Sequence, residues 1–293
     1  MIFDTHCHAY WRGLENREEA VRANMSAAGV CGSIQIGADI ESSRLALDTA
    51  IRWGAGAWCT VGIHPSDCQD ISVDSCEKIM RELDRLRESR SDKVVGIGET
   101  GLDYYHLTPG KEASQKEAQF AFFAAQARLA QRLDLPLVIH TRDAAADTIG
   151  LIKENGVRRA VIHCFSEDAR FAEELTSWSE EIRFSFSGIL TYKNARAIQD
   201  AAVYLPLDRI LVETDSPFLL PAGAQGENGV NEPAFTRHVM DFLKTLRPEP
   251  PEIVEQIVWN NSLAFFRISD KFFLKAGQRR FPTGDHAGTG ISG

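Results

Sequence analysis

The sequence predicts one (β/α)8 barrel of the TIM type, an α/β fold, over residues 1–268. Short runs rich in apolar and β-branched residues alternate with segments of helical period almost from end to end. Eight such runs in about 270 residues is the number that an eight-stranded α/β barrel requires. A doubly wound open sheet is the competing fold, but no Gly-rich dinucleotide loop follows the first run. Because no linker or change of composition divides the chain, we expect a single domain.

The predicted strands are short runs bounded by glycine, proline or polar residues. In chain order they are residues 2–5, 33–37, 58–63, 94–99, 137–140, 160–163, 183–187 and 210–213. Between them, apolar residues recur three or four positions apart, as a helix with one buried face requires. These stripes include Val21, Met25 and Ala28; Ile79, Leu83 and Leu86; Phe120, Phe123, Ala127 and Ala130; and Phe171, Leu175 and Trp178. After the eighth strand we expect two further helices, at 235–246 and 253–266.

The last segment, residues 269–293, is predicted to be a flexible tail. It ends in KAGQRRFPTGDHAGTGISG, which is rich in glycine, weakly apolar and without helical or strand period. We expect His286, within this segment, to be a solvated residue.

Composition indicates a globular protein of the cytoplasm. The chain has 293 residues, of which 44% are hydrophobic and 25% charged, and no apolar run approaches the roughly 20 residues of a membrane helix. We expect no signal peptide, because the first residues already form a strand. The six cysteines form no CxxC pair, which favours reduced thiols over a disulfide framework. Cys7 and Cys164, each next to a histidine, are expected to pack into the barrel wall.

The net charge limits the possible partners. A formal charge of −9 without a Lys/Arg-rich run argues against a protein that coats nucleic acid electrostatically. A phosphodiester substrate stays possible, because bound divalent cations can supply positive charge locally.

Two histidines close the first strand, in DTHCH beside Asp4. Residues i and i+2 of a strand point to the same face, so His6 and His8 would face the same way and could form half of a metal site. From this stretch alone, a strand end with two solvated histidines is an equal alternative.

The other strand ends decide between these alternatives. A lone histidine at a strand end is more often structural than a metal ligand, but here six of eight strands deliver a histidine or carboxylate to the rim where such barrels place their chemistry. Beyond the first strand, these residues are His64, Glu99, His140, His163 and Asp215 with Glu213. Only His106, His238 and His286 lie off this pattern. The agreement predicts a metal site.

Four histidines and two carboxylates are about twice the ligand set of one catalytic zinc ion. They suit two divalent ions ~3.5–4 Å apart, bridged by a carboxylate and by a water that becomes a nucleophile at neutral pH. Glu99, opposite the first strand in an eight-strand ring, is the natural bridge. Asp215 could bind the ion held by His6 and His8 and also accept the proton of the water. The ligands leave Zn²⁺, Mn²⁺ and Mg²⁺ open.

These motifs resemble the TatD family of metal-dependent deoxyribonucleases, within the amidohydrolase superfamily. The matching segments, in order between residues 1 and 268, are DTHCH, GIHP, GIGETGLDYY, LPLVIHTRDA, VIHCFS, SGILTYKNA, VETDSPFLLP and NEPAF. The resemblance implies a distorted metal-dependent hydrolase barrel with two ions. It assigns one ion to His6, His8, Glu99 and Asp215, and the other to Glu99, His140 and His163. It also implies hydrolysis of DNA phosphodiesters, often from 3′ ends of single strands.

The chain departs from the family pattern at three places. Ser66 stands where a second histidine is usual after GIHP, and Glu167 stands where a glycine is usual after HCFS. The segment before NEP, usually of the form RGKR, reads QGENGV here and contains Glu227 but no Arg or Lys. A basic patch that would face phosphates is therefore missing.

The first functional hypothesis is a two-metal deoxyribonuclease that acts on DNA ends, with single-stranded DNA as the substrate. In it, His64 donates a hydrogen bond to a phosphoryl oxygen and Arg142 pairs with a phosphate. A surface ion pair of Arg142 with Asp143 or Asp147 is an equal alternative. Asp103 and Tyr104 are expected to fix the loop after Glu99 and not to touch substrate.

The second hypothesis is an amidohydrolase or esterase that acts on a small molecule with the same metals; the acidic surface and the missing basic segment favour it. A third, a non-enzymatic interaction protein, is disfavoured because it has no need for an intact ligand set. We expect no membrane partner. The sequence does not fix the oligomeric state and is compatible with a monomer.

Overall fold

Eight parallel strands follow one another around the barrel in chain order in a computed structural model, which describes residues 1–274. Each strand pairs with the next, and a bridge between Cys7 and Ser216 links the last strand to the first. The strands are β1 (Ile2–Cys7), β2 (Val30–Gln35), β3 (Ala57–Val61), β4 (Val94–Asp103), β5 (Leu137–Arg142), β6 (Ala160–Ile162), β7 (Ile182–Phe186) and β8 (Ile210–Val212). The predicted (β/α)8 barrel is confirmed.

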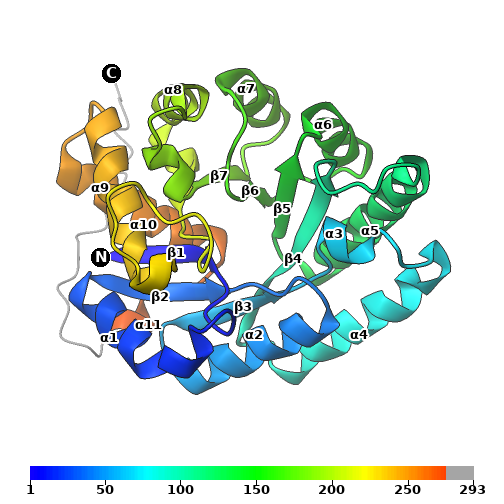
Figure 1. The fold of residues 1–293 in the computed structure, drawn as a ribbon, viewed down its shortest axis with the longest axis horizontal. Helices are drawn as coiled ribbons and strands as arrows, with labels where there is room; N and C mark the ends of the chain where they lie inside the picture. Colours follow the sequence, from blue (N-terminus) through cyan, green and yellow to red (C-terminus); the bar gives the residue numbers. More distant parts are fainter. Residues whose placement is uncertain (275–293) are drawn as a thin grey trace, which may run out of the picture.

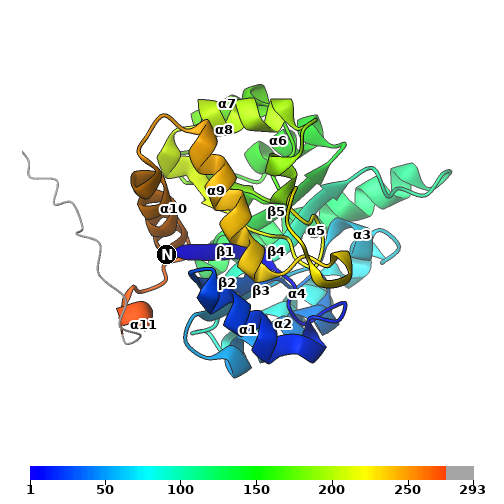
Figure 2. The ribbon, with the colours of Figure 1, turned by 60° about the vertical axis from the view of Figure 1, so that its left-hand side comes forward.

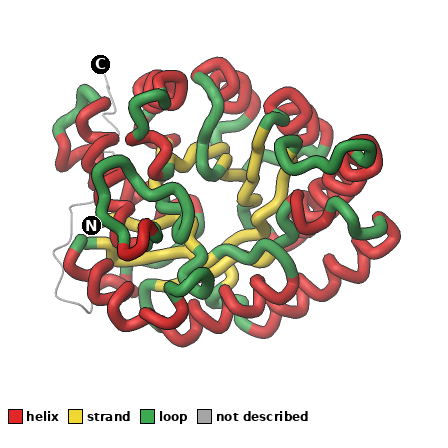
Figure 3. The backbone as a smooth tube through the Cα atoms, in the orientation of Figure 1, coloured by secondary structure: helices red, strands yellow, loops and turns green. Residues whose placement is uncertain are grey.

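Helices surround the strands on the outside (Figures 1 and 3). They are α1 (Glu18–Ala27), α2 (Ile40–Trp53), α3 (Pro65–Cys68), α4 (Cys76–Ser89), α5 (Glu112–Leu133), α6 (Ala145–Glu154), α7 (Ala169–Trp178), α8 (Arg196–Tyr204), α9 (Thr236–Leu246), α10 (Pro251–Phe265) and α11 (Lys271–Leu274). Each stripe predicted from the sequence falls on one of them or at its end. Within residues 1–274, none of these helices is long and apolar enough to cross a membrane.

Local signals begin several of these helices. At α2, Ser42 donates its backbone N–H to Asp39 Oδ1 (2.6 Å) and Asp39 donates its backbone N–H to Ser42 Oγ (2.8 Å), a reciprocal capping box. At α7, Phe171 donates its N–H to Asp168 Oδ1 at 2.9 Å. Helix α10 begins with Pro251, whose missing N–H costs nothing in the first turn.

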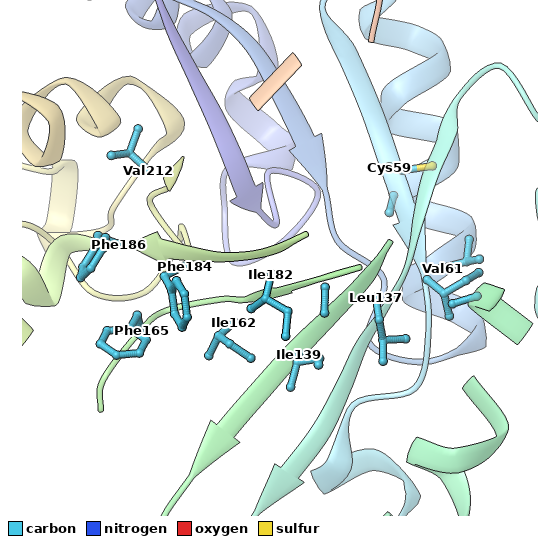
Figure 4. Close-up of a cluster of buried hydrophobic side chains, with 14 of the residues drawn as sticks. Cys59, Val61, Leu137, Ile139, Ile162, Phe165, Ile182, Phe184, Phe186 and Val212 are labelled. Atoms are coloured by element: carbon cyan, nitrogen blue, oxygen red, sulfur yellow. The ribbon is translucent and has the colours of Figure 1, made fainter. Parts of the chain in front are cut away.

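The barrel has two separate apolar layers. Phe3, Ile34, Trp58, Val138 and others from seven strands pack into one cluster, which is possible only inside the ring. Side chains of α10, among them Trp259 and Leu263, belong to the same cluster, and Figure 2 shows α10 beside the start of β1. The alternate strand residues face the helices instead; Figure 4 shows this outer layer, including Leu137, Ile139, Ile162 and Phe184. Where the strand pairing is regular, strand alternation therefore assigns residues to the barrel interior or to the helices.

Helical structure continues past residue 268, where the domain was predicted to end. The short helix α11 falls in the segment 269–293 that was predicted to be tail, and Phe273 is 6% exposed and packs on Phe3 and Trp259. The sequence did not predict this helix because four residues are too few to show a helical period. Residues 275–293, with His286, lie outside the described residues.

Two buried glutamines of α5 hold the ends of β3 and β4. Gln126 is fully buried; its Oε1 accepts the N–H of Ile63 (2.8 Å), and its Nε2 donates to the Ile63 carbonyl (2.9 Å) and to Thr100 Oγ1 (2.7 Å). Gln119 makes the same pair of hydrogen bonds, with the backbone N–H and carbonyl of Asp103. These contacts satisfy backbone groups that the strands leave unpaired near the rim.

We expect Gln126→Leu to lower the free energy of unfolding by about 2 kcal/mol, because it leaves the buried N–H and carbonyl of Ile63 without partners. Denaturant unfolding measures this change. The matched control is Gln131→Leu, at an exposed position of the same helix whose side chain bonds only the Asn155 carbonyl; it should change stability by less than about 0.5 kcal/mol. Equal effects of the two substitutions would contradict the role given to Gln126.

Candidate metal centre

Strand alternation brings three of the predicted residues into the barrel interior. Val138 and Val161 belong to the inner layer, so His140 and His163, two residues further on, share their face. Leu211 also belongs to the inner layer, so Glu213, two residues further on, faces the interior too. The register of β5 and β6 is regular, with Leu137 opposite Ala160, so both histidines reach the same level of the barrel.

The first strand reaches the same arrangement through a bulge. Phe3 belongs to the inner layer, and strict alternation from Phe3 would turn His6 away from the interior. The pairing with β2 slips by one residue between Asp4 and Cys7, which is the mark of a β-bulge. After it, Cys7 turns to β2, where it donates to the Ile34 carbonyl and accepts from Gln35, while His6 lies inside. The prediction that Cys7 packs into the wall agrees with this geometry.

Glu99 lies at the centre of the cluster, 4% exposed. Its Oε1 is 2.8 Å from His163 Nε2, 3.1 Å from His140 Nδ1 and 3.4 Å from His64 Nε2. Its Oε2 is 3.4 Å from His6 Nε2. One carboxylate therefore contacts imidazoles from four strand ends.

The other carboxylate, Asp215, completes the side of the cluster near β1. Its Oδ1 lies 3.6 Å from His6 Nε2 and 3.5 Å from His8 Nε2. Asp4 holds the residue before Asp215 in place, because its carboxylate accepts the backbone N–H (2.9 Å) and the hydroxyl (2.7 Å) of Thr214. All six residues predicted as metal ligands thus meet in one place.

A close approach of β3 and β4 sets the position of Glu99. A Cβ on Gly62 would lie 2.3 Å from the carbonyl carbon of Gly98, so no larger residue fits at Gly62 without backbone movement. The glycines of GIHP and GIGE therefore allow His64 and Glu99 to meet.

The donor set fits divalent metal ions. His6 is fully buried, and neither of its ring nitrogens has a hydrogen-bond partner, which is costly unless another ligand satisfies them. Three sets of donor atoms lie within 4.8 Å of one another: His6, His8 and Asp215; His6, Glu99 and His163; and His64, Asp103 and His140. Imidazole and carboxylate groups at this spacing are typical of zinc and manganese sites.

Three of the histidines are oriented by an acceptor behind the ring. His163 Nδ1 lies 3.3 Å from Glu213 Oε1, His140 Nε2 lies 3.3 Å from Asp103 Oδ2, and His8 Nδ1 lies 3.1 Å from the Ile36 carbonyl. Such a contact places the proton on the outer nitrogen and leaves the inner one free to bind a metal. Asp103 is therefore better placed to orient His140 than to bind an ion itself.

His64 differs from these histidines because its ring proton faces the cluster and not an acceptor behind the ring. Ser66 donates its backbone N–H to His64 Nδ1 at 3.1 Å, so the proton of the neutral ring lies on Nε2, the nitrogen that faces Glu99. Burial lowers the pKa of His64 to about 3 and keeps the ring neutral. His64 is thus an N–H donor in the cavity, which agrees with the substrate-binding role predicted for it.

The two central carboxylates are anionic. Burial alone would raise the pKa of Glu99, but His163, His64 and His140 hold it well below its usual value. Burial likewise opposes ionisation of Asp215, and contacts with His8 and His6 lower its pKa. The pKa of His6 is lowered by burial and by His163, so this ring is neutral.

A cavity of about 500 Å³ opens above these residues. Trp11, Phe218 and Leu219 form an apolar part of its lining, and Arg142 also lines it. Cys164, which was predicted to pack into the barrel wall, lines it too. Its φ of 44° is left-handed, which breaks the strand alternation on which the prediction depended.

The segment after Glu99, which was predicted to be a loop, continues β4 as far as Asp103 and contributes to the cavity. Asp103 holds the following loop, since it accepts the N–H of His106 (3.0 Å), and it also lines the cavity beside His140. His106 lines the cavity too, with Nδ1 2.7 Å from Asp103 Oδ2. Tyr104 does hold the loop, through a hydrogen bond to Asp147.

Arg142 has no ion pair in the described part of the chain, so the alternative of a surface pair with Asp143 or Asp147 does not hold. Its guanidinium lies 3.8 Å from the ring centre of Tyr105.

An ion pair between a glutamate and an arginine holds the segment before NEP. Glu227 Oε2 lies 3.0 Å from Arg17 Nη2, and Glu232 Oε2 lies 3.5 Å from the same nitrogen. Asn231 is fully buried and donates to the carbonyls of Thr214 (3.0 Å) and Phe218 (2.6 Å). The NEP segment therefore braces the loop that carries Asp215, and Glu227 neutralises a nearby arginine.

Comparison with known proteins gives a consistent result. A family model described as TatD related DNase matches residues 3–267. The metal-dependent hydrolase YcfH of Escherichia coli K12 is 38% identical over 210 residues, 71% of this chain and 72% of the relative. The metal-dependent hydrolase YabD of Bacillus subtilis is 32% identical over 271 residues, 92% of this chain and 100% of the relative. The crystal structure of YJJV, a TatD homolog from Escherichia coli, superimposes with a TM-score of 0.81 at 29% identity and covers 92% of this chain and 98% of that one.

Proposed function

The chain belongs to the TatD-related DNase family of metal-dependent hydrolases, and from this premise we propose that it hydrolyses DNA phosphodiester bonds with two divalent ions. The proposed substrate is single-stranded DNA, cut from its 3′ end. His6, His8, Glu99 and Asp215 would hold one ion, and Glu99, His140 and His163 the other. Glu99 supports this division because its two oxygens face the two groups of histidines separately.

One observation favours a phosphodiester over a neutral substrate. Arg142 lines the cavity without a carboxylate partner among the described residues, so its charge is available to an anionic ligand. The N–H of His64 faces the same cavity. A substrate with anionic oxygens would satisfy both groups.

When bound, the ions would lower the pKa of a water and draw negative charge from the phosphoryl oxygens. The residues of this chain would supply the remaining functions. Asp215, anionic and at the cavity, would accept the proton of the attacking water. His64 would donate a hydrogen bond to a phosphoryl oxygen, and Arg142 would pair with a phosphate of the bound strand. The imidazole-rich set favours Zn²⁺ or Mn²⁺, and Mg²⁺ stays compatible with two carboxylates and a phosphate.

A small-molecule amidohydrolase or esterase is the second candidate. The apolar lining by Trp11, Ile189, Phe218 and Leu219 would suit a small organic substrate. The contact of Glu227 with Arg17 also removes a positive charge that a nucleic acid would use.

The two candidates are separated by one assay. The metal-loaded protein, with its metal content measured, is tested against single-stranded DNA, an amide panel and an ester panel. Release of nucleotides from 3′ ends supports the proposal, whereas turnover confined to amides or small esters would establish the second candidate.

We expect Glu99→Gln to lower the rate of hydrolysis by at least about a hundredfold, because the substitution keeps the shape but removes the charge shared by both ions. The circular dichroism spectrum should stay unchanged. Glu173→Gln, at an exposed position of α7, is the control and should keep normal turnover. Near-normal turnover in Glu99→Gln would refute the two-metal site.

Binding of single-stranded DNA should depend only weakly on salt. The basic groups near the rim are Arg12, Arg142 and Lys193, and three phosphate contacts give a log–log slope of roughly −2. Glu227→Lys adds one cation, while Glu232 still pairs with Arg17, so the substitution should strengthen binding and steepen the slope to roughly −3. Fluorescence anisotropy across a salt series measures both effects.

The control for this experiment is Glu173→Lys, which makes the same charge change on the outer face of the barrel. A steep slope in the unsubstituted protein would show that a phosphate-binding patch lies elsewhere. Absence of DNA binding with metal present would favour the small-molecule candidate.

A further inference from the structure

Exposed aromatic rings, each in contact with an arginine, flank the mouth of the cavity on two sides. On one side, Trp11 follows β1 and is 46% exposed. The guanidinium carbon of Arg12 lies 4.9 Å from the ring centre of Trp11 and 4.6 Å from that of Phe218. The Trp11 and Phe218 rings meet edge to face with centroids 5.5 Å apart.

On the other side, Tyr105 follows β4 and is 61% exposed. The guanidinium carbon of Arg142, at the end of β5, lies 3.8 Å from its ring centre. Trp11 and Arg142 both line the cavity, and β1 and β5 are four positions apart in a ring of eight, so one member of each pair lies on opposite sides of the cavity.

The first pair lies close to the candidate metal ligands. The ring centroids of Trp11 and Phe218 lie 6.4 Å and 6.3 Å from that of His8. If the phosphate of a ligand lies at the metal centre formed with Glu99 and Asp215, the group attached to that phosphate would therefore lie over Trp11. A flat group that covers an exposed tryptophan removes its apolar face from water, and every nucleobase has such a flat face.

We propose that Trp11 is the stacking platform for the base of the nucleotide whose phosphate lies at the metal centre, and that Tyr105 stacks the base on the opposite side. This inference rests on the proposed nuclease function and specifies how substrate is held. Arg12 and Arg142, fixed against the rings, lie where they can contact backbone phosphates. Stacking on an aromatic ring tolerates any base, so the platform gives affinity without sequence preference.

Stacking also accounts for substrate binding without the basic segment. The QGENGV segment brings no cation to the mouth, and Glu227 holds Arg17. Because one stacked base strengthens binding by roughly tenfold or more, the two rings can replace several phosphate contacts.

The test compares two phosphates that differ only in the base. Binding of thymidine 5′-monophosphate and of 2-deoxyribose 5-phosphate is measured by calorimetry with Mg²⁺ present, so no turnover of a phosphodiester is needed. We expect the nucleotide to bind about tenfold more tightly than the sugar phosphate. Trp11→Ala should remove this difference, and Trp11→Phe should keep most of it.

The controls separate stacking from a structural effect. Trp11 donates its backbone N–H to the His8 carbonyl at 3.1 Å, a bond that the side-chain substitutions leave in place, and the metal content of each variant confirms that His8 is unmoved. Tyr204→Ala removes an equally exposed ring (49%) from α8 and should leave both affinities unchanged.

Each result decides one of the two proposals. Equal binding of the two phosphates by the unsubstituted protein, or an unchanged difference in Trp11→Ala, would overturn the stacking platform even if DNA is hydrolysed. A tenfold difference that Trp11→Ala abolishes supports the platform. If single-stranded DNA is then not cleaved, the nuclease function fails while the platform stands for another nucleotide ester.

Discussion

Glu99 is an anion held inside the barrel, and the arrangement of the site depends on how its charge is satisfied. Its carboxylate is 4% exposed and contacts His6, His64, His140 and His163. A buried carboxylate without partners would cost several kcal/mol or would be protonated. Imidazoles from four strand ends prevent this, and the same imidazoles are the groups that would bind metal. The charge of Glu99 therefore holds the site together before any ion is bound.

Holding Glu99 there requires local departures from regular strand geometry. The pairing of β4 with its neighbours slips by one residue on each side, and that of β1 slips before His6. Cys164 and Asp215 have left-handed φ values of 44° and 56°. Such backbone is tolerated where neighbouring contacts fix it. Gln126 and Gln119 provide these contacts for β3 and β4, and Asn231 provides them for the loop with Asp215.

The fold and the central residues could be predicted because they follow from period and position. Eight alternating runs define the barrel, and a polar residue that ends a buried run, as His140 and His163 do, must reach the rim. Asp103 could not be assigned correctly, because Glu99, Thr100 and Gly101 resemble the end of a strand, whereas β4 continues to Asp103. The contact of Glu213 with His163 joins residues 50 positions apart and leaves no local pattern. The position of Cys164 depends on its own left-handed backbone conformation, which the sequence does not reveal. The ion pair of Glu227 with Arg17 joins residues that only the tertiary fold brings together.

We propose that Glu99 joins two metal ions, and the positions of the bound ions test this proposal. The measurement is a crystal structure of the Mn²⁺- or Zn²⁺-loaded protein, with anomalous scattering to place each ion. We expect two ions ~3.5–4 Å apart, one beside His6, His8 and Asp215 and one beside His140 and His163, with an oxygen of Glu99 bound to each. A single ion, or an ion between His64, Asp103 and His140 that leaves Glu99 without a bound metal, would contradict the two-metal site.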